Sequence, residues 1–279
     1  MTNTLTSFEI RSDGAYDFSL PLLLQNSPQL QSLCISSDSV LQQYDLLSPL
    51  RYLRFFYLGL HSQQEFYEGI DGLRRLFQSL PYVQHVTLAN VIHNVDILPA
   101  FAPVLDGLIS LTTMRAMHLW LQKEESVENL EPVLQANSAS LLHLAVTLRH
   151  QQNFAPLTNH PFPNLTYLHI DTDQFFLFSE QLSELCFQRQ VPALNTLSLR
   201  ATSNRYRNNQ LPGEIAQLEG RLANLYTAIG TLGHLHTLRL VNMDFSRPIY
   251  RNAAVAMLNA LSAYGHLGSL YLYSCNSVD

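Results

Sequence analysis

One short apolar pattern recurs along the chain. In FPNLTYLHID (162–171), Leu165, Leu168 and Ile170 stand at spacings of three and two, with polar residues among them. The same phrase returns in three later segments: VPALNTLSLR (191–200), LGHLHTLRLV (232–241) and YGHLGSLYLY (264–273). This alternation predicts a short strand with one buried face, and its recurrence predicts a repeat architecture.

Ten segments fit the pattern φ-x-x-φ-x-φ, where φ is an apolar residue. Their first positions are Leu5, Leu30, Leu50, Val83, Met114, Leu141, Leu165, Leu194, Leu235 and Leu267. The fourth and sixth positions, such as Leu168 and Ile170, are expected to be buried, and the third, fifth and seventh should face outward. In six repeats a proline or glycine stands two residues before the first position. These residues end a preceding helix and turn the chain into the strand.

The segments between the strands have a helical period. Apolar residues recur at helical spacing in four of them: 64–80, 174–189, 213–232 and 249–264. Each repeat is therefore a strand followed by a helix, which is the crossover that parallel strands need. Because strands stack about 4.8 Å apart and helices need roughly 10 Å, the stack should bend with its strands inside the curve. The prediction is an α/β solenoid shaped like a horseshoe.

Across essentially the whole chain, these repeats resemble the leucine-rich-repeat superfamily. The opening P-x-L-x-x-L-x-I, as in PNLTYLHI (163–170), is most similar to the repeat region of fungal-type F-box/leucine-rich-repeat proteins. The resemblance implies one domain over 1–279, with a concave parallel sheet, convex helices and about ten irregular repeats. A long insertion and helix, 201–233, separates repeats eight and nine. The family's Asn or Cys eight residues after the first position is mostly missing, so uneven curvature is expected.

The ends leave three interpretations open. Leu5 and Leu272 lie close to the two termini, whereas a solenoid needs polar caps. The chain is a piece of a longer protein, or a partner or second copy covers its ends, or residues 1–29 form an atypical cap. An F-box would implicate a ubiquitin ligase, but the one F-box-like string, LPGEI (211–215), is followed too soon by the strand at Leu235.

The outward positions predict a partner-binding surface rich in aromatic, histidine and arginine side chains. The candidate residues are Tyr52, Arg54, Phe56, His85, His118, Trp120, Tyr167, His169, Arg200, Arg205, Arg207 and Arg239. Exposed aromatics and arginines are typical anchors of protein interfaces. For Phe56 and Trp120, packing against neighbouring loops is the alternative, and for the arginines it is a solvated loop balanced by Asp244 and Glu214.

Composition narrows the function further. With 16 Lys and Arg against 22 Asp and Glu, the net charge of −6 argues against general nucleic-acid binding. No catalytic or metal-binding motif is found, so no enzyme activity, cofactor or metal is expected. The three cysteines are too few for a disulfide framework, and no apolar run is long enough to span a membrane, which predicts a cytoplasmic or nuclear protein.

The sequence therefore predicts a scaffold that binds a protein or peptide on its concave face, with an acidic or phosphorylated segment meeting the arginines. Substrate recognition in an F-box-type ubiquitin ligase is the specific role that the resemblance implies. The alternative is a structural or assembly protein that oligomerises through uncapped solenoid ends.

Overall fold

A computed structural model describes most of the repeated elements. The described residues are 5–11, 26–36, 50–60, 77, 80, 82–90, 111, 114–121, 131–148, 155–173, 175–187, 190–202, 212–243, 245 and 248–275. The chain divides into two compact units. The N-terminal unit comprises Met1–Trp120 with Pro132–Leu141, and the C-terminal unit comprises Leu121–Glu131 with Leu142–Asp279. That residues 1–279 form a single domain stays a prediction.

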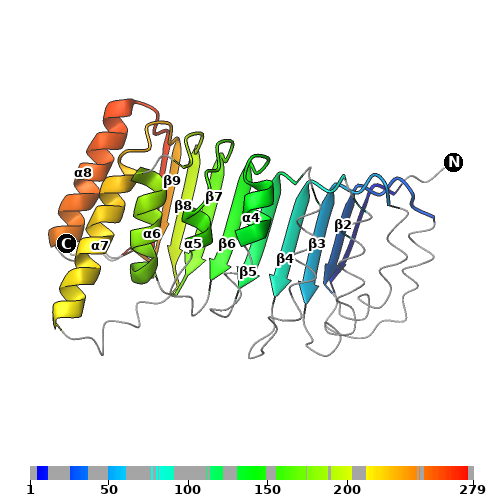
Figure 1. Cartoon of the computed structure of the whole chain (residues 1–279), viewed down its shortest axis with the longest axis horizontal. Helices are drawn as coiled ribbons and strands as arrows, with labels where there is room; N and C mark the ends of the chain where they lie inside the picture. Colours follow the sequence, from blue (N-terminus) through cyan, green and yellow to red (C-terminus); the bar gives the residue numbers. More distant parts are fainter. Residues whose placement is uncertain are drawn as a thin grey trace. The chain divides into compact units, whose positions relative to one another are not determined.

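Ten strands follow one another in chain order in a parallel sheet (Figure 1). The first five are β1 (Ser7–Arg11), β2 (Ser32–Ser36), β3 (Phe55–Leu60), β4 (His85–Asn90) and β5 (Ala116–Leu121). The next five are β6 (His143–Leu148), β7 (Tyr167–Thr172), β8 (Thr196–Ala201), β9 (Thr237–Val241) and β10 (Ser269–Tyr273). This topology, with helices between strands, confirms the α/β leucine-rich-repeat solenoid that the apolar pattern predicts.

Helices connect the strands of the C-terminal unit. They are α5 (Ala155–Thr158), α6 (Phe175–Phe187), α7 (Pro212–Ile229) and α8 (Pro248–Tyr264). Helix α4 (Glu131–Asn137), which comes before β6 in the sequence, belongs to the N-terminal unit except for Glu131. Helices α6, α7 and α8 confirm the helices predicted at 174–189, 213–232 and 249–264. Within the C-terminal unit, α6 packs on α7 and α7 packs on α8 (Figure 1). The helix predicted at 64–80 lies outside the described residues, apart from Phe77 and Leu80.

In the inner repeats the core consists of the first, fourth and sixth positions, whereas Leu5 of the first repeat and Leu270 and Leu272 of the last are exposed, against the prediction. Leu168, Ile170 and Leu199 are fully buried, and only 2% of Leu197 is exposed. Equivalent positions pair across neighbouring strands, so that Leu168 faces Leu197 and Ile170 faces Leu199. These observations confirm the predicted division into inward and outward residues.

A recurring turn precedes seven of the ten strands. The backbone N–H of the first position donates to the carbonyl of the residue three before it. Seven described repeats share this bond, whose donors are Leu30, Leu53, Val83, Met114, Leu165, Leu194 and Leu235. The residue two before the first position therefore takes the second place of a tight turn, as Pro28, Pro163, Pro192 and Gly233 do. Proline's fixed φ is favourable at that place. The residue that accepts the bond is usually apolar and buried, as Phe162 and Val191 are.

This turn shows that the strand of the third repeat begins later than the sequence pattern predicts. The sequence pattern takes Leu50 as its first position, but Leu53 donates to the Leu50 carbonyl, and Leu53 is therefore the first position. Phe56 pairs with Leu33 and Leu58 with Ile35, so the strand lies three residues later than predicted. The sequence fits both settings, Leu50, Leu53 and Phe55 or Leu53, Phe56 and Leu58. The structure takes the second, in which all three residues are buried, whereas Phe55 is exposed. The shift exchanges the two phenylalanines: Phe56 is core and Phe55 faces outward.

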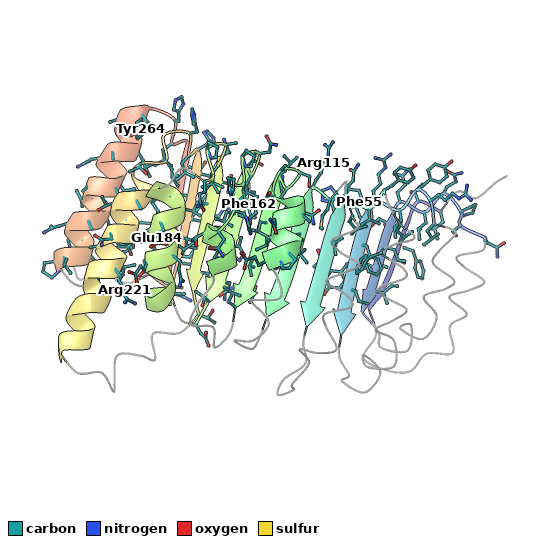
Figure 2. All side chains as sticks on the ribbon, in the orientation of Figure 1. Phe55, Arg115, Phe162, Glu184, Arg221 and Tyr264 are labelled. Atoms are coloured by element: carbon teal, nitrogen blue, oxygen red, sulfur yellow. The ribbon has the colours of Figure 1, made fainter. Side chains whose placement is uncertain are left out.

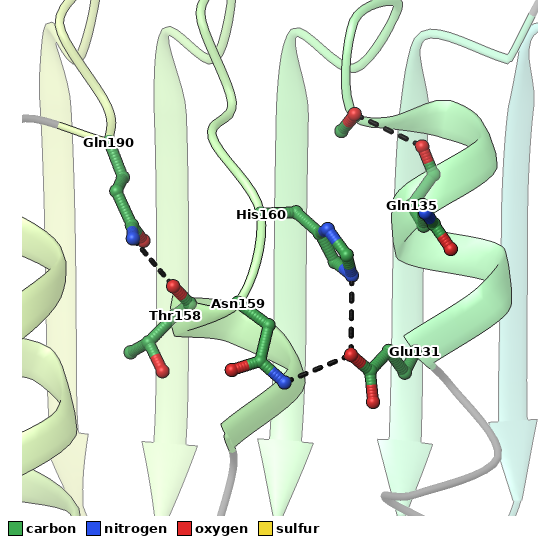
Figure 3. A network of polar contacts seen from close by, with 7 residues as sticks. Glu131, Gln135, Thr158, Asn159, His160 and Gln190 are labelled. Atoms are coloured by element: carbon green, nitrogen blue, oxygen red, sulfur yellow. Dashed lines mark hydrogen bonds and ion pairs between the residues drawn. The ribbon is translucent and has the colours of Figure 1, made fainter.

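Polar contacts anchor the loops around α5 on the helical side of the C-terminal unit (Figure 3). The Asn159 side chain donates to the Glu131 carboxylate at 2.9 Å, and His160 Nε2 lies 3.4 Å from the same oxygen. The Gln190 side chain donates to the Thr158 carbonyl. The contacts of Glu131 connect the start of α4 with the chain before β7, and the Gln190 bond connects the chain before β7 with the chain before β8. We assign all three a structural role.

Candidate protein-binding surface

In the C-terminal unit, the outward positions of β7 to β10 form a polar face. The pairing places His169 beside Ser198 and Ser198 beside Arg239, and it places Asp171 beside Arg200. Arg239 is in turn paired with Tyr271 of β10. We call this set of six residues the arginine face: His169, Asp171, Ser198, Arg200, Arg239 and Tyr271. It unites three predicted residues, His169, Arg200 and Arg239, with three that were not predicted.

His169 is held at the centre of the arginine face. Its Nδ1 atom lies 2.9 Å from the Ser198 hydroxyl. Burial lowers the pKa of His169 below its ordinary value of 6.5, the Asp171 carboxylate opposes that shift, and the neighbouring Arg200 reinforces it. A neutral imidazole therefore lies among the charged groups at neutral pH.

Asp171 limits the positive charge of this surface. Its side chain is buried and accepts a hydrogen bond from the Thr202 hydroxyl. The Arg200 Nε atom lies 4.0 Å from the Asp171 carboxylate, while half of the Arg200 side chain remains exposed. At this distance the ion pair is loose, and the guanidinium is free to turn its remaining donors toward a ligand.

Arg239 is positioned by an aromatic ring. Its guanidinium carbon lies 4.9 Å from the centre of the Tyr271 ring, a cation–π contact. The Tyr271 ring stacks on Tyr273 with centroids 6.1 Å apart. Arg239 and Arg200 stand on neighbouring strands two residues out of register, which sets their Cα atoms about 8 Å apart. Two guanidinium groups at this spacing can hold one acidic group between them.

Two aromatic pairs lie on outward positions of the sheet. In the C-terminal unit, His143 stacks on the predicted residue Tyr167, with ring centroids 5.7 Å apart. In the N-terminal unit, Phe55 stacks on the predicted residue His85, with centroids 4.3 Å apart. Phe55 is 45% exposed (labelled in Figure 2) and lines a shallow hollow together with Cys34, Tyr57 and Thr87.

The remaining predicted residues divide into three groups. Tyr52 and Arg54 are exposed just before β3, and His118 is partly buried on β5. The prediction of Phe56 as a binding residue is wrong, because its ring is buried edge-on against Phe77 with centroids 5.8 Å apart. The side chain of Trp120, and Arg205 and Arg207 entirely, lie outside the described residues.

Neither a metal site nor a membrane-spanning helix is found in the described part of the chain. Among the residues that the structure describes, no three histidine, cysteine or acidic side chains are grouped so as to hold a metal ion. Within that same part of the chain, no helix combines the length and apolar composition needed to cross a lipid bilayer.

Comparison with known proteins supports the fold. The structure is similar to the crystal structure of the leucine-rich repeat-containing protein LegL7 from Legionella pneumophila, with a TM-score of 0.50 and 19% sequence identity. The match covers 96% of this chain and 83% of LegL7. No family model and no curated protein sequence matches the chain. The chain thus has the leucine-rich-repeat fold, as its apolar pattern predicts.

Proposed function

We propose that this protein is a non-enzymatic recognition scaffold whose arginine face binds an acidic segment of a partner protein. The observation that carries the proposal is the pair Arg200 and Arg239, which stand outward on adjacent strands of the sheet. Arg239 is held by its contact with the Tyr271 ring, whereas Arg200 lies loosely beside Asp171 with half of its side chain exposed. The preorganised Arg239 loses little side-chain entropy when it binds a carboxylate or phosphate, and Arg200 can turn its donors toward the same group.

The partner that this surface fits is an extended peptide segment. A parallel sheet offers rows of side chains about 4.8 Å apart, so a ligand that crosses the strands meets one side chain from each repeat. Such a segment would place its acidic group between Arg200 and Arg239 and an apolar or aromatic group on the stacked rings of His143 and Tyr167. The aromatic rings supply contact area, and the arginines supply orientation.

The resemblance of these repeats to the repeat region of F-box/leucine-rich-repeat proteins suggests one role for this surface, substrate recognition in a ubiquitin ligase. That role shares the same chemistry, since acidic and phosphorylated motifs are typically read by clustered arginines. In the N-terminal unit, Phe55 and His85 form a separate aromatic surface, which we propose as an accessory contact for the same class of partner.

A random-peptide display library tests the proposal while the natural partner is unidentified. Peptides selected on the wild-type protein should be enriched in Asp and Glu. They should bind the double variant Arg200→Ala/Arg239→Ala about tenfold or more weakly, because the variant loses two charge-assisted contacts.

The matched control is Arg221→Ala/Arg251→Ala, which removes the same charge from helices α7 and α8. Its affinity for the selected peptides should equal that of the wild type. Equal binding by the wild type and the Arg200/Arg239 variant would refute recognition at the arginine face.

A further inference from the structure

The N-terminal unit carries exposed tyrosine and arginine side chains at the edge where its strands begin. Tyr52 and Tyr82 are 52% and 61% exposed, and each stands just before the first position of its repeat. Arg54 and Arg115 each stand just after the first position, and both are exposed (Arg115 is labelled in Figure 2). We call the surface formed by Tyr52, Arg54, Tyr82, Gln84 and Arg115 the strand-entry surface.

Backbone hydrogen bonds set the spacing of the two arginines. The Gln84 N–H donates to the Arg54 carbonyl at 2.9 Å, and the Arg115 N–H donates to the Gln84 carbonyl at 2.7 Å. The three residues therefore form one row across three neighbouring repeats, with Gln84 partly buried in the middle. Since neighbouring strands lie about 4.8 Å apart, the Cα atoms of Arg54 and Arg115 are about 9.6 Å apart.

The charge of this surface is positive and unbalanced among the residues that the structure describes. The described part of the N-terminal unit contains four arginines, Arg11, Arg51, Arg54 and Arg115, and one acidic residue, Glu9. Glu9 lies on β1, two strands away from β3. Within the described residues, neither Arg54 nor Arg115 forms an ion pair with an acidic side chain. A partner that meets these two arginines should therefore bring negative charge.

A segment in the polyproline II conformation matches the spacing of the two arginines. It has three residues per turn and rises about 3.1 Å per residue, so side chains three apart lie on one side about 9.3 Å from each other. In an extended strand, the side chains on one side are about 6.6 Å or about 13 Å apart, and neither distance matches about 9.6 Å. Two acidic residues three apart in a polyproline II segment can thus reach Arg54 and Arg115 together.

The other residues of the strand-entry surface suit the rest of such a segment. Proline-rich segments bind to surfaces lined by aromatic rings, and Tyr52 and Tyr82 occupy the same place in consecutive repeats beside the row of the arginines. A polyproline II backbone makes no internal hydrogen bonds, so its carbonyls can accept from the side-chain amide of Gln84.

From these observations we infer that the strand-entry surface binds an acidic, proline-rich segment of a partner protein, with the pattern Glu-Pro-Pro-Glu, in the polyproline II conformation. The two acidic residues contact Arg54 and Arg115, and the prolines between them contact the tyrosine rings. The inference goes beyond the proposed function, because this surface lies in the other compact unit and uses none of the residues of the arginine face.

Fluorescence anisotropy with the labelled synthetic peptide Glu-Pro-Pro-Glu-Pro-Pro-Glu tests the inference. The wild type should bind the peptide, and Arg54→Ala/Arg115→Ala should bind it about tenfold or more weakly, because the variant loses two charge-assisted contacts. Tyr52→Ala/Tyr82→Ala should also bind it about tenfold more weakly, since it loses the aromatic surface. All four side chains are exposed, so both variants should keep the unfolding midpoint of the wild type.

The matched control is again Arg221→Ala/Arg251→Ala, which removes the same charge from the C-terminal unit and should bind the peptide with wild-type affinity. Absence of binding by the wild type, or equal binding by the wild type and the Arg54/Arg115 variant, would overturn the inference.

A second peptide of the same composition tests the spacing. In Glu-Pro-Glu-Pro-Glu-Pro-Pro no two glutamates are three apart, so in the polyproline II conformation only one of them can face the two arginines at a time. It should bind the wild type about tenfold more weakly than the first peptide. Equal binding of the two peptides would refute recognition of the polyproline II spacing. Tighter binding of a short single-stranded oligothymidylate than of the first peptide would also overturn the inference and would identify a nucleic-acid ligand instead.

The two binding surfaces can be tested separately. Arg200→Ala/Arg239→Ala should bind the proline-rich peptide with wild-type affinity. A saturating concentration of that peptide should not displace an acidic library peptide whose binding depends on Arg200 and Arg239. A failure of one proposal therefore leaves the other intact.

Discussion

Replacing Leu197 by alanine is the sharpest test of the inward and outward assignment. Leu197 is 2% exposed and lies between Leu168 and Leu238, its fully buried partners on β7 and β9. The substitution removes three carbon atoms, which at about 0.8 kcal/mol each is a transfer loss of about 2.4 kcal/mol. A sheet held on both sides cannot collapse fully around the gap, so the cavity raises the total cost to between about 2 and 5 kcal/mol.

Urea unfolding followed by circular dichroism measures this cost. The control is Thr196→Ala, one residue earlier in β8 and on the opposite face, where the side chain makes a long 3.4 Å contact with Asn195. Its cost should stay within about 0.5 kcal/mol. Since both residues lie in the C-terminal unit, they report on the same unfolding event. Equal unfolding midpoints for the two variants would refute the assignment of the strand faces.

Three further predictions concern the side chains of Phe56, Cys186 and His169. Phe56→Ala should lower the free energy of unfolding by about 3–5 kcal/mol, while Phe55→Ala should change it by less than about 1 kcal/mol. A larger loss for Phe55→Ala would show instead that Leu50 is the first position of the third repeat, as the sequence pattern predicts. Burial raises the pKa of the Cys186 thiol to about 12, so a thiol reagent should modify the other two cysteines of the native protein and reach Cys186 only on unfolding. Burial lowers the pKa of His169 below 6.5, so its stabilising contribution should be lost as the pH falls from 6.5 through the lowered pKa. His169→Gln should therefore lose less stability than the wild type between about pH 7 and about pH 5, as measured by urea midpoints.

The fold was predictable because the buried pattern is repeated many times. A strand that pairs with two similar strands requires apolar residues at the same positions in each, and Leu168, Leu197 and Leu238 show this directly. The third repeat could not be set by the apolar pattern alone, since Leu50 and Leu53 both fit the first position. An apolar residue three before the first position, as in the repeats with Leu80 and Leu111, does not resolve it either, because Leu47 and Leu50 fill that place in the two settings. The pairing of β3 with β2 decides the register.

The binding surface was less predictable, because it depends on contacts across strands. The positions of His169, Arg200 and Arg239 on the outward face follow from strand alternation. The carboxylate of Asp171 beside Arg200 and the ring of Tyr271 beneath Arg239 depend on which residues the register places side by side.

The exposure of the last strand was also beyond the reach of the repeat pattern. Whether Leu270 and Leu272 are buried depends on what covers the far edge of β10. The pattern within a repeat describes the strand itself and not its neighbour, so it assigns these leucines to the core like their counterparts in the other strands.

Association kinetics test the central claim, that the arginine face recognises an acidic partner. The measurement is the association rate of a selected acidic peptide with the wild type and with Arg200→Ala/Arg239→Ala, over increasing salt. Exposed charges steer association and are screened within about 10 Å at 0.1 M salt. The wild-type rate should therefore fall steeply with salt, and the rate for the variant should be slower and nearly independent of it. The same salt dependence in both proteins would contradict recognition at the arginine face.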